Sequence, residues 1–442
     1  MPFAKTDHLS GSTDLVEFPS MINEEGSYNA NFFPELGKYF EDHFAFRPQM
    51  VTANAFLRNN IFKDSGTDQV VVGNDGFYYF SGTLDDYLGK NDLTDRDLKS
   101  IANNLSIIQN YVESHGSNFA FAIAPNKNTL YPSFMPYYYK QTQKQHNADR
   151  LKLYLKEYGI HYIDMFDLFF NDDDVNYLKE DSHWSNRGAL KATNNILQYL
   201  TKNKIEVEKW QTRNDRDGDI YAMMYPSIIG TEVEDYAIGY NDKQDLTGNN
   251  WKFIYGNSVE DSVSATNSNG DKYLYMYRDS FANAMIPYLS SAYEKAVYSK
   301  LIPYNLVAAI ENKSSDVLIE RAERHLSYLC EVAPLMPSPI VKIGNFVDAV
   351  DESNSTLQFE ANEDYVNLFG SINPDIFDES KNIYIQVEGQ NYKNTFRAFC
   401  LKDNSYYVRI NRSECPEFLN IKIMSEQNSC IYMINEYNVQ VK

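Results

Sequence analysis

The sequence predicts an α/β fold with a mainly parallel sheet covered on both faces, followed by a C-terminal β-sandwich. Between about residues 94 and 331, short apolar runs alternate with amphipathic segments of helical period, the pattern of a parallel sheet with helices on both sides. Beyond a proline-rich stretch at 334–339, the pattern changes to short alternating runs such as NIYIQVEG, YYVRI and LNIKIM. Their spacing of about 8–12 residues is typical of a sandwich.

We expect five segments along the 442-residue chain. Residues 1–30 are polar and aperiodic, which indicates a loose arm. Residues 31–333 form the α/β domain, and an Asp-, Asn- and Gly-rich insertion of loops and short strands interrupts it at 205–270. Residues 334–344 are a linker, and residues 345–442 are the sandwich. A hydrophobic content of 43% is enough for two cores.

The first elements are two short helices and a hairpin. The run NFFPELGKYFEDHFAFRPQMVTANAFLRNNIF predicts helices punctuated by Pro34 and Pro48. Residues 70–80, VVVGNDGFYYF, place two β-rich runs around Asn74-Asp75-Gly76, a strong hairpin signal.

The α/β alternation then follows in order. Apolar residues from Leu98 to Val112 recur at helical spacing, with Thr94 as the N-cap and Gly116 as the stop. Further strands are predicted at 119–124, 160–164, 272–277, 296–299 and 316–319. Further helices are predicted at 148–158, from the Ser185 cap to about 202, and at 281–291, 304–312 and 321–331.

Charge narrows the function classes. The net charge of −21 excludes an ordinary nucleic-acid binder and disfavours docking on anionic lipid through a basic patch. The chain has no apolar run of about 18 residues and no visible signal peptide. The expectation is a cytoplasmic protein, or one whose anchor is missing from this chain.

Neither cysteines nor acids predict a metal or a cofactor. The four cysteines form no CxxC motif, and the spacing leaves open a Cys415–Cys430 disulfide or free thiols. Asp172-Asp173-Asp174 is expected to be a solvated loop, because no HxH, HExxH or EF-hand spacing accompanies it.

The first chemical candidate is the DxH pair Asp181 and His183, just before the Ser185 cap. In an extended loop, residues i and i+2 point to the same side, so the carboxylate can fix one ring nitrogen and leave the other as a base. A solvated loop histidine is the structural alternative.

The second candidate is Ser280, where the strand KYLYMY runs through Arg278-Asp279 into a helix. There a serine lies at the carboxyl edge of the sheet, and its own N–H can stabilise an oxyanion. The alternative is that Ser280 only caps its helix. Ser, His and Asp are the nucleophile, base and orienter of acyl transfer, so we expect Ser280, His183 and Asp181 to converge.

Six segments occur in one order over about residues 37–330: YFEDHFAFRPQMVTAN, VVVGNDGFYYF, IAPNKNTLYPSFMP, DSHWSNRGA, DSFANAMIPYL and SDVLIERAERHL. Together they resemble the SGNH-hydrolase-like polysaccharide O-acetyltransferases related to the alginate acetylation proteins, and within them the Gram-positive DHHW family. The resemblance implies an SGNH-like three-layer sandwich with Ser280 as nucleophile, His183 as base and Asp181 as orienter. The chain departs from the pattern at Arg278, where close relatives have Gly, and it lacks a recognisable Gly-x-Asn-Asp oxyanion block.

Five further residues are candidates for substrate binding. Lys127 and Asn126 follow the 119–124 strand and could reach a substrate or an oxyanion, or Lys127 could be a surface lysine. Arg278 could bind an acidic sugar or build the turn. Tyr131 and Trp184 are aromatic residues on which a sugar ring could stack.

The resemblance implies transfer of acetyl to hydroxyls of an extracytoplasmic polysaccharide, with a membrane-bound O-acyltransferase supplying the donor side and the sandwich holding glycan. It also implies a membrane-tethered or secreted protein. Two rivals stay open: a carbohydrate acetyl esterase with the same triad and water as acceptor, and a non-catalytic glycan-binding scaffold of exopolysaccharide assembly.

Overall fold

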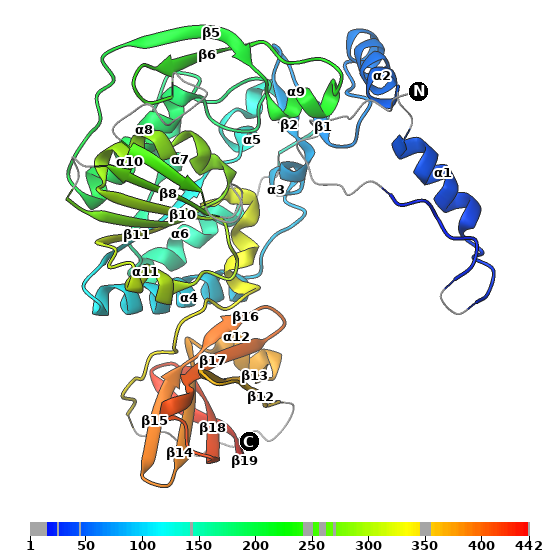
Figure 1. Cartoon of the computed structure of the whole chain (residues 1–442). Helices are drawn as coiled ribbons and strands as arrows, with labels where there is room; N and C mark the ends of the chain where they lie inside the picture. The colour runs from blue at the N-terminus through cyan, green and yellow to red at the C-terminus, as the bar shows by residue number, and fades with distance from the viewer. Residues whose placement is uncertain are drawn as a thin grey trace.

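The computed structural model describes residues 16–23, 26–43, 46–141, 145–241, 251–255, 262–267, 271–344 and 355–440. Half of the predicted arm, residues 1–15, and part of the 205–270 insertion lie outside these ranges. Figure 1 shows an α/β body, a β-sandwich beside it and two N-terminal helices that project from the body. Among the described helices, none combines the length and the apolar character that a bilayer crossing requires.

The N-terminal elements are as predicted. Helices α1 (Phe32–His43) and α2 (Arg47–Phe62) precede the hairpin of β1 (Val70–Val72) and β2 (Tyr78–Phe80). Gly76 adopts a φ of 81° at the hairpin turn, in the region that favours glycine. The short helix α3 (Leu84–Leu88) follows after a 3-10 turn, η1 (Ser81–Thr83).

The body is built on a seven-stranded sheet of order β4-β3-β11-β9-β10-β8-β7. Strands β4, β3, β11, β9 and β10 pair in parallel, and β8 pairs antiparallel with both β10 and β7, so β7 at the edge runs in the same direction as those five. The strands are β3 (Asn118–Ala124), β4 (Tyr162–Ile163), β7 (Trp251–Tyr255), β8 (Ser262–Asn267), β9 (Tyr273–Tyr277), β10 (Lys295–Ser299) and β11 (Asp316–Ala322). The predicted parallel strands are confirmed. The insertion differs from the prediction, because its β7 and β8 extend the main sheet.

Helices cover both faces of this sheet. They are α4 (Asp95–Ser114), α5 (Lys127–Leu130), α6 (Asn147–Glu157), α7 (Met165–Phe170), α8 (Asn186–Leu200), α10 (Ile286–Ala292) and α11 (Leu306–Glu311). Helix α9 (Asp219–Met224) packs instead against the β1–β2 hairpin and α2. Thr94 caps α4 in a capping box, and Ser185 caps α8 by accepting from the Gly188 N–H, as predicted.

Strand β3 shows how the sequence makes three layers. Its Phe119, Phe121 and Ile123 point to one face and pack with α4 and α6. Its alanines at 120, 122 and 124 point to the other face and pack with α7, α8 and α10. The small side chains allow those helices to approach the sheet closely, so both faces are buried.

Two predicted helices take another form. The 281–291 segment is a 3-10 helix, η4 (Ser280–Ala284), followed by α10, and Pro287 lies in the first turn of α10. The 321–331 segment is a 3-10 helix, η5 (Glu323–Cys330), and it begins two residues later than predicted because β11 continues through Ala322. A further 3-10 turn, η2 (Pro132–Phe134), follows α5. Strands β5 (Trp210–Arg216) and β6 (Glu232–Ala237) form a separate two-stranded sheet.

The C-terminal part is a sandwich of two four-stranded antiparallel sheets, β12-β13-β17-β16 and β15-β14-β18-β19, as predicted. Its strands are β12 (Gln358–Ala361), β13 (Tyr365–Ser371), β14 (Asn382–Gly389), β15 (Tyr392–Arg397), β16 (Phe399–Leu401), β17 (Ser405–Asn411), β18 (Phe418–Gln427) and β19 (Cys430–Gln440), with helix α12 (Pro374–Glu379) and the turn η6 (Arg412–Glu414). All four cysteines are free, so Cys415 and Cys430 are not bonded.

Buried polar groups fasten the sandwich to α4. Asn104 donates to the carbonyls of Leu329 and Cys400 and accepts from the Cys400 N–H, and Arg397 donates to Asn103. Phe399 of the sandwich lies in the apolar cluster of the body. The predicted domain limits, 31–333 and 345–442, stay predictions.

Candidate active site

Ser280 stands at the carboxyl end of β9, at the first position of η4. The N-cap of η4 is Asp279, whose Oδ1 accepts the Phe281 N–H at 2.9 Å and whose Oδ2 accepts the Ala322 N–H at 2.6 Å. The Ser280 hydroxyl is therefore not needed as a helix cap. Within the described part of the chain the Ser280 N–H has no acceptor, so it is available to an oxyanion.

Ser280, His183 and Asp181 meet in one line of hydrogen bonds. The Ser280 Oγ lies 2.8 Å from Nε2 of His183, and Nδ1 of His183 lies 2.7 Å from Oδ1 of Asp181. The predicted convergence is confirmed as geometry, although the DxH loop follows helix α7 rather than a strand. A carboxylate on Nδ1 leaves Nε2 to accept a proton from the serine, which is the arrangement of a nucleophile and its base.

Asp181 is held as an anion in the interior. Its side chain is 1% exposed, and its Oδ2 accepts two hydrogen bonds from Arg216, from Nε at 3.1 Å and from Nη2 at 2.5 Å. Burial acts to raise the pKa of Asp181, but the hydrogen bond from His183 and the Arg216 charge outweigh it and lower that pKa. The carboxylate thus stays ionised while it orients the imidazole.

A second carboxylate supports the same loop. Asp219, at the start of α9, accepts from the Ser182 N–H at 2.6 Å and from the Ser182 hydroxyl at 2.5 Å. Its Oδ2 is 3.6 Å from Nδ1 of His183. Burial and the neighbouring Asp181 charge raise the pKa of Asp219.

Asp181, His183 and Asp219 each place one carboxylate or imidazole atom within 4.8 Å of the others, a grouping that could hold a metal ion. Both His183 nitrogens are engaged, by Asp181 and by Ser280, so neither is available as a metal ligand. The Asp172-Asp173-Asp174 run is partly paired, because Lys191 binds Asp172 and Asp174.

Lys127 has a different place from either alternative that the sequence left open. Its Nζ donates to the carbonyls of Leu178, Lys179 and Asp181 at 2.9, 2.8 and 2.8 Å, and the residue is 4% exposed. Three acceptors match the three N–H groups of the charged amine. The prediction of a substrate-binding lysine is therefore wrong: Lys127 holds the loop that carries Asp181 and His183.

Burial lowers the pKa of Lys127 to about 7, and the nearby carboxylates of Asp181, Glu232 and Asp219 oppose that shift. Glu232 holds the same loop from the other side, since it accepts the N–H groups of Lys179 and Glu180 at 2.5 and 3.0 Å. The loop is thus fixed by side chains of α5, α9 and β6.

Gly218 lets the insertion approach this loop. A Cβ at that position would come within 2.3 Å of the Glu180 carbonyl oxygen. The backbone contact brings Asp219 and Arg216, which flank Gly218, against the DxH loop.

The predictions for Asn126 and Arg278 as substrate-binding residues are also wrong, because both side chains are buried. Asn126 is fully buried, and its amide nitrogen donates to Asp86 at 3.1 Å. Arg278 is 2% exposed and donates to the Asp279 carbonyl and to Asn283 Oδ1, so it builds the turn beside Ser280.

The two aromatic candidates are packed into the body rather than presented to a sugar. Trp184 is 2% exposed, its ring packs edge-on against Phe281, and its Nε1 donates to the Phe281 carbonyl at 3.0 Å. Tyr131 is half-buried, its ring contacts Phe77 and Tyr177, and its hydroxyl accepts the Asn176 N–H. Neither supports the predicted stacking role.

Sequence reasoning missed Arg216, Asp219 and Glu232, which come from the insertion and have no motif of their own. It also missed Arg324 on η5. The Arg324 guanidinium lies 5.5 Å from the Phe281 ring centre and 5.8 Å from that of Phe80, and among the described residues it forms no hydrogen bond or ion pair. It is a half-exposed cation next to the residue that follows Ser280.

Comparison with known proteins gives a family match. A model described as "SGNH hydrolase-like domain, acetyltransferase AlgX" matches residues 70–224. This range contains Lys127, Asp181, His183 and Arg216, and it ends before Ser280. A comparison with curated proteins finds no match.

Three solved structures are similar at low identity. A DHHW family protein from Eubacterium siraeum is 18% identical, with 59% of this chain and 92% of that chain covered and a TM-score of 0.44. PatB1 of Bacillus cereus with a sulfonyl adduct is 14% identical, with 58% and 95% covered and a TM-score of 0.44. AlgX of Pseudomonas aeruginosa is 12% identical, with 88% and 99% covered and a TM-score of 0.37.

The assignment rests on the family match and on the chain's own strand order. The match agrees with the motif order in the sequence and with a mainly parallel, two-sided sheet whose carboxyl edge carries the serine. Residues 70–224 are therefore similar to the SGNH hydrolase-like domain described for the acetyltransferase AlgX.

Proposed function

We propose that this protein transfers an acetyl group to hydroxyls of an extracytoplasmic polysaccharide through an acetyl-Ser280 intermediate. The observation that carries the proposal is the chain of hydrogen bonds from Ser280 Oγ to His183 Nε2 at 2.8 Å and from His183 Nδ1 to Asp181 at 2.7 Å. The family match, which describes an acetyltransferase, supports the reaction class.

In the first half-reaction, Ser280 Oγ attacks the carbonyl carbon of an acetyl donor while His183 Nε2 takes the hydroxyl proton. The carbonyl oxygen becomes an oxyanion, and the Ser280 N–H stabilises it. Collapse expels the leaving group, which takes the proton from His183. Asp181, kept ionised by Arg216, stabilises the imidazolium that forms in between.

In the second half-reaction, a sugar hydroxyl gives its proton to His183 and attacks the acetyl-serine carbonyl. The ester bond to Ser280 breaks, and Ser280 Oγ recovers the proton from His183. The same steps with water as acceptor describe an acetyl esterase. A membrane-bound O-acyltransferase that delivers acetyl on the outer side of the cytoplasmic membrane is the donor partner of this proposal.

The sandwich is the proposed holder of the polysaccharide. An open groove of about 530 Å³ lies at the ends of β14, β18 and β19, and Glu388, Asn420 and Asn438 are among its lining residues. The Asn420 amide nitrogen donates to Glu436 and Asn438, whereas its Oδ1 has no partner among the described residues. Amide and carboxylate groups are suited to sugar hydroxyls.

The test is an incubation with 4-methylumbelliferyl acetate, with and without an oligosaccharide acceptor. Mass spectrometry should find acetyl on the Ser280 peptide and on the oligosaccharide, and Ser280→Ala should lose both. Ser291→Ala, a serine of α10 whose hydroxyl donates to the Tyr288 carbonyl, is the matched control and should keep both. Free acetate without acetylated sugar favours the esterase. No turnover and no labelling of wild type favours the glycan-binding scaffold.

A further inference from the structure

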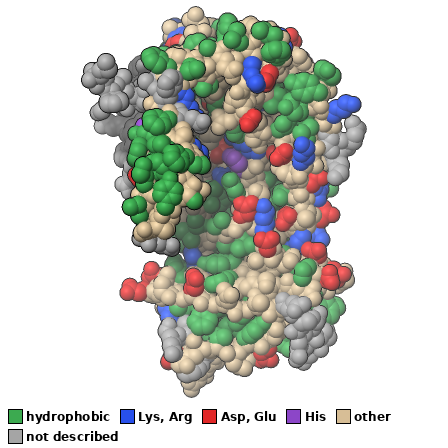
Figure 2. Space-filling model, turned by 90° about the vertical axis from the view of Figure 1, so that its right-hand side faces the viewer, with side chains coloured by type: hydrophobic (Ala, Val, Ile, Leu, Met, Phe, Trp, Pro, Cys, Tyr) green, Lys and Arg blue, Asp and Glu red, His purple; other side chains and the backbone are tan. Residues whose placement is uncertain are grey.

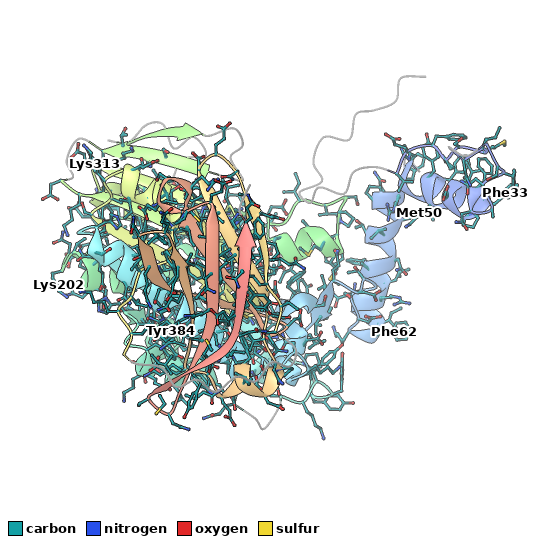
Figure 3. The ribbon with its side chains drawn as sticks, turned by 90° about the horizontal axis from the view of Figure 1, so that it is seen from below. Phe33, Met50, Phe62, Lys202, Lys313 and Tyr384 are labelled. Carbon is teal, nitrogen blue, oxygen red and sulfur yellow. The ribbon has the colours of Figure 1, made fainter. Side chains whose placement is uncertain are left out.

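The two N-terminal helices form an arm that projects from the body. Figure 1 shows α1 and α2 beside the α/β layers, and Figure 3, seen from below, shows Phe33, Met50 and Phe62 along this projection. We use "helical arm" for residues 32–62. Seven of the large apolar side chains of α1 and α2 are 59–73% exposed: Phe33 and Phe40 of α1, and Met50, Phe56, Leu57, Ile61 and Phe62 of α2. Figure 2 shows hydrophobic side chains gathered on the projecting lobe.

Helix α2 has two opposite faces. Thr52, Ala55 and Asn59 face the body: Thr52 accepts from Ser227, Ala55 lies in an apolar cluster with α9, and Asn59 donates to the Tyr225 hydroxyl at 2.8 Å. Met50, Leu57 and Ile61 are separated by seven and four positions, so they form one stripe on the other side of the helix. The body therefore fastens α2 with that stripe pointing outward.

The shape of the stripe selects a helix as its partner. The spacing of Met50, Leu57 and Ile61, repeated in α1 by Phe33 and Phe40, is the narrow seam of a helix pair. Asn54, Arg58 and Asn60 are exposed beside it. A helix that lies in a bilayer presents a broader apolar face.

The exposed area fits an interface. The five side chains of these seams, at about 60% exposure, present roughly 500 Å². The largest apolar patch of a monomer is about 300–600 Å², and a specific interface takes about 800 Å² from each partner. The arm alone thus supplies more than half of one side of an interface.

The charge of α2 permits its stripe to be buried against protein. Helix α2 itself has Arg47 and Arg58 and no acid, so no carboxylate must be buried when its stripe is covered. An isologous pair, in which the same stripe of two copies meets, covers both at once.

We infer that the helical arm is a dimerisation element, and that its occupant is the arm of a second copy of this chain. The inference is independent of the proposed acetyl transfer, because it involves no residue of the triad or of the loop that carries it.

Sedimentation equilibrium of the full chain at about 1–50 μM is the test, in the concentration range of specific interfaces. Wild type should have twice the monomer mass of 51.1 kDa. The double variant Leu57→Glu, Ile61→Glu should have the monomer mass, with unchanged circular dichroism. The control Leu153→Glu, at a 64% exposed leucine of α6, should stay dimeric.

Three results would overturn the inference. One is a wild type that stays at 51.1 kDa over the whole range. Another is a double variant that remains dimeric, which would place the interface elsewhere. The third is flotation of wild type, but not of the double variant, with vesicles of phosphatidylglycerol and phosphatidylethanolamine, which would assign the stripe to lipid.

Discussion

The substitution Lys127→Met tests whether Lys127 positions the loop that carries Asp181 and His183 or binds substrate. Met keeps the length of the stem but removes the ammonium that donates to the Leu178, Lys179 and Asp181 carbonyls. The Lys179 carbonyl keeps a second donor, the Tyr78 N–H at 2.8 Å. The carbonyls of Leu178 and Asp181 have no other donor among the described residues, so the substitution leaves two buried acceptors without a hydrogen bond.

The size of the effect follows from those two acceptors. An unsatisfied buried carbonyl costs about 1–3 kcal/mol, so the stranded pair costs about 2–6 kcal/mol. The Met variant no longer has the cost of burying a charged ammonium, and this gain offsets part of the loss. The net decrease in the free energy of unfolding is about 2–4 kcal/mol. Movement of the His183 loop by about 1 Å should lower kcat by roughly 10²-fold. KM should stay within about threefold, because Lys127 does not reach substrate in this structure.

The assay combines thermal unfolding with kcat and KM for p-nitrophenyl acetate. Lys179→Met is the matched control: this lysine belongs to the same loop, but its Nζ donates to the Asp75 carbonyl at the surface, and both readouts should hardly change. A Lys127→Met protein with wild-type stability and kcat but a raised KM would refute the reasoning and restore the substrate-binding lysine.

Four further predictions concern the triad, its support, a buried acid and the sandwich. Ser280→Ala should abolish turnover and leave the melting temperature unchanged, because Asp279 caps η4; a stability loss of more than about 1 kcal/mol would contradict this. Arg216→Met should lower kcat by about 10–100-fold through Asp181, whereas Arg213→Met, on the same strand and stacked on Tyr236, should not. Burial raises the pKa of Glu323 from 4.5 to about 8, so the stability it contributes is complete below about pH 4.5 and is lost as pH rises towards 8; Glu323→Gln should flatten that decline in melting temperature, and a parallel curve would disprove it. Asn104→Ala should cost about 2–4 kcal/mol and speed proteolysis near residues 340–355 without changing kcat for a small ester; unchanged proteolysis would show that the docking of the sandwich does not depend on Asn104.

The nucleophile and the base could be recognised in advance because their signals are local. Ser280 follows a strand and Asp181 precedes His183 by two positions, so each pattern is visible within a few residues. Only Ser280 follows the end of a parallel strand, whereas the DxH loop follows α7, so their meeting at 2.8 Å was decided by the tertiary structure.

The supporting residues had no such signal. Arg216 lies 35 positions after Asp181, in a stretch that reads only as an irregular insertion, and Glu232 and Asp219 look like ordinary acids of an acidic chain. Their roles come from burial and from opposite charge across the loop, which depend on distant contacts. The same reason explains the errors at Lys127 and Trp184, whose residue types suggested contact with substrate but whose side chains are buried.

The sequence by itself determined the elements that depend on neighbours in the chain. These elements depend on residues two to four positions apart, a spacing that the backbone geometry of helices and strands fixes. Examples are the Thr94 and Ser185 caps, the turn at Gly76 and the Phe/Ala alternation of β3. Only the tertiary structure decided which polar groups are buried together. Whether Lys127 binds substrate or three carbonyls depends on contacts with residues 51–54 positions along the chain. Whether Arg324 lies beside the site depends on its packing against Phe80 and Phe281, which belong to other segments. A buried polar side chain requires a hydrogen-bond partner, because burial removes its water. The sequence does not show which partner will lie within reach.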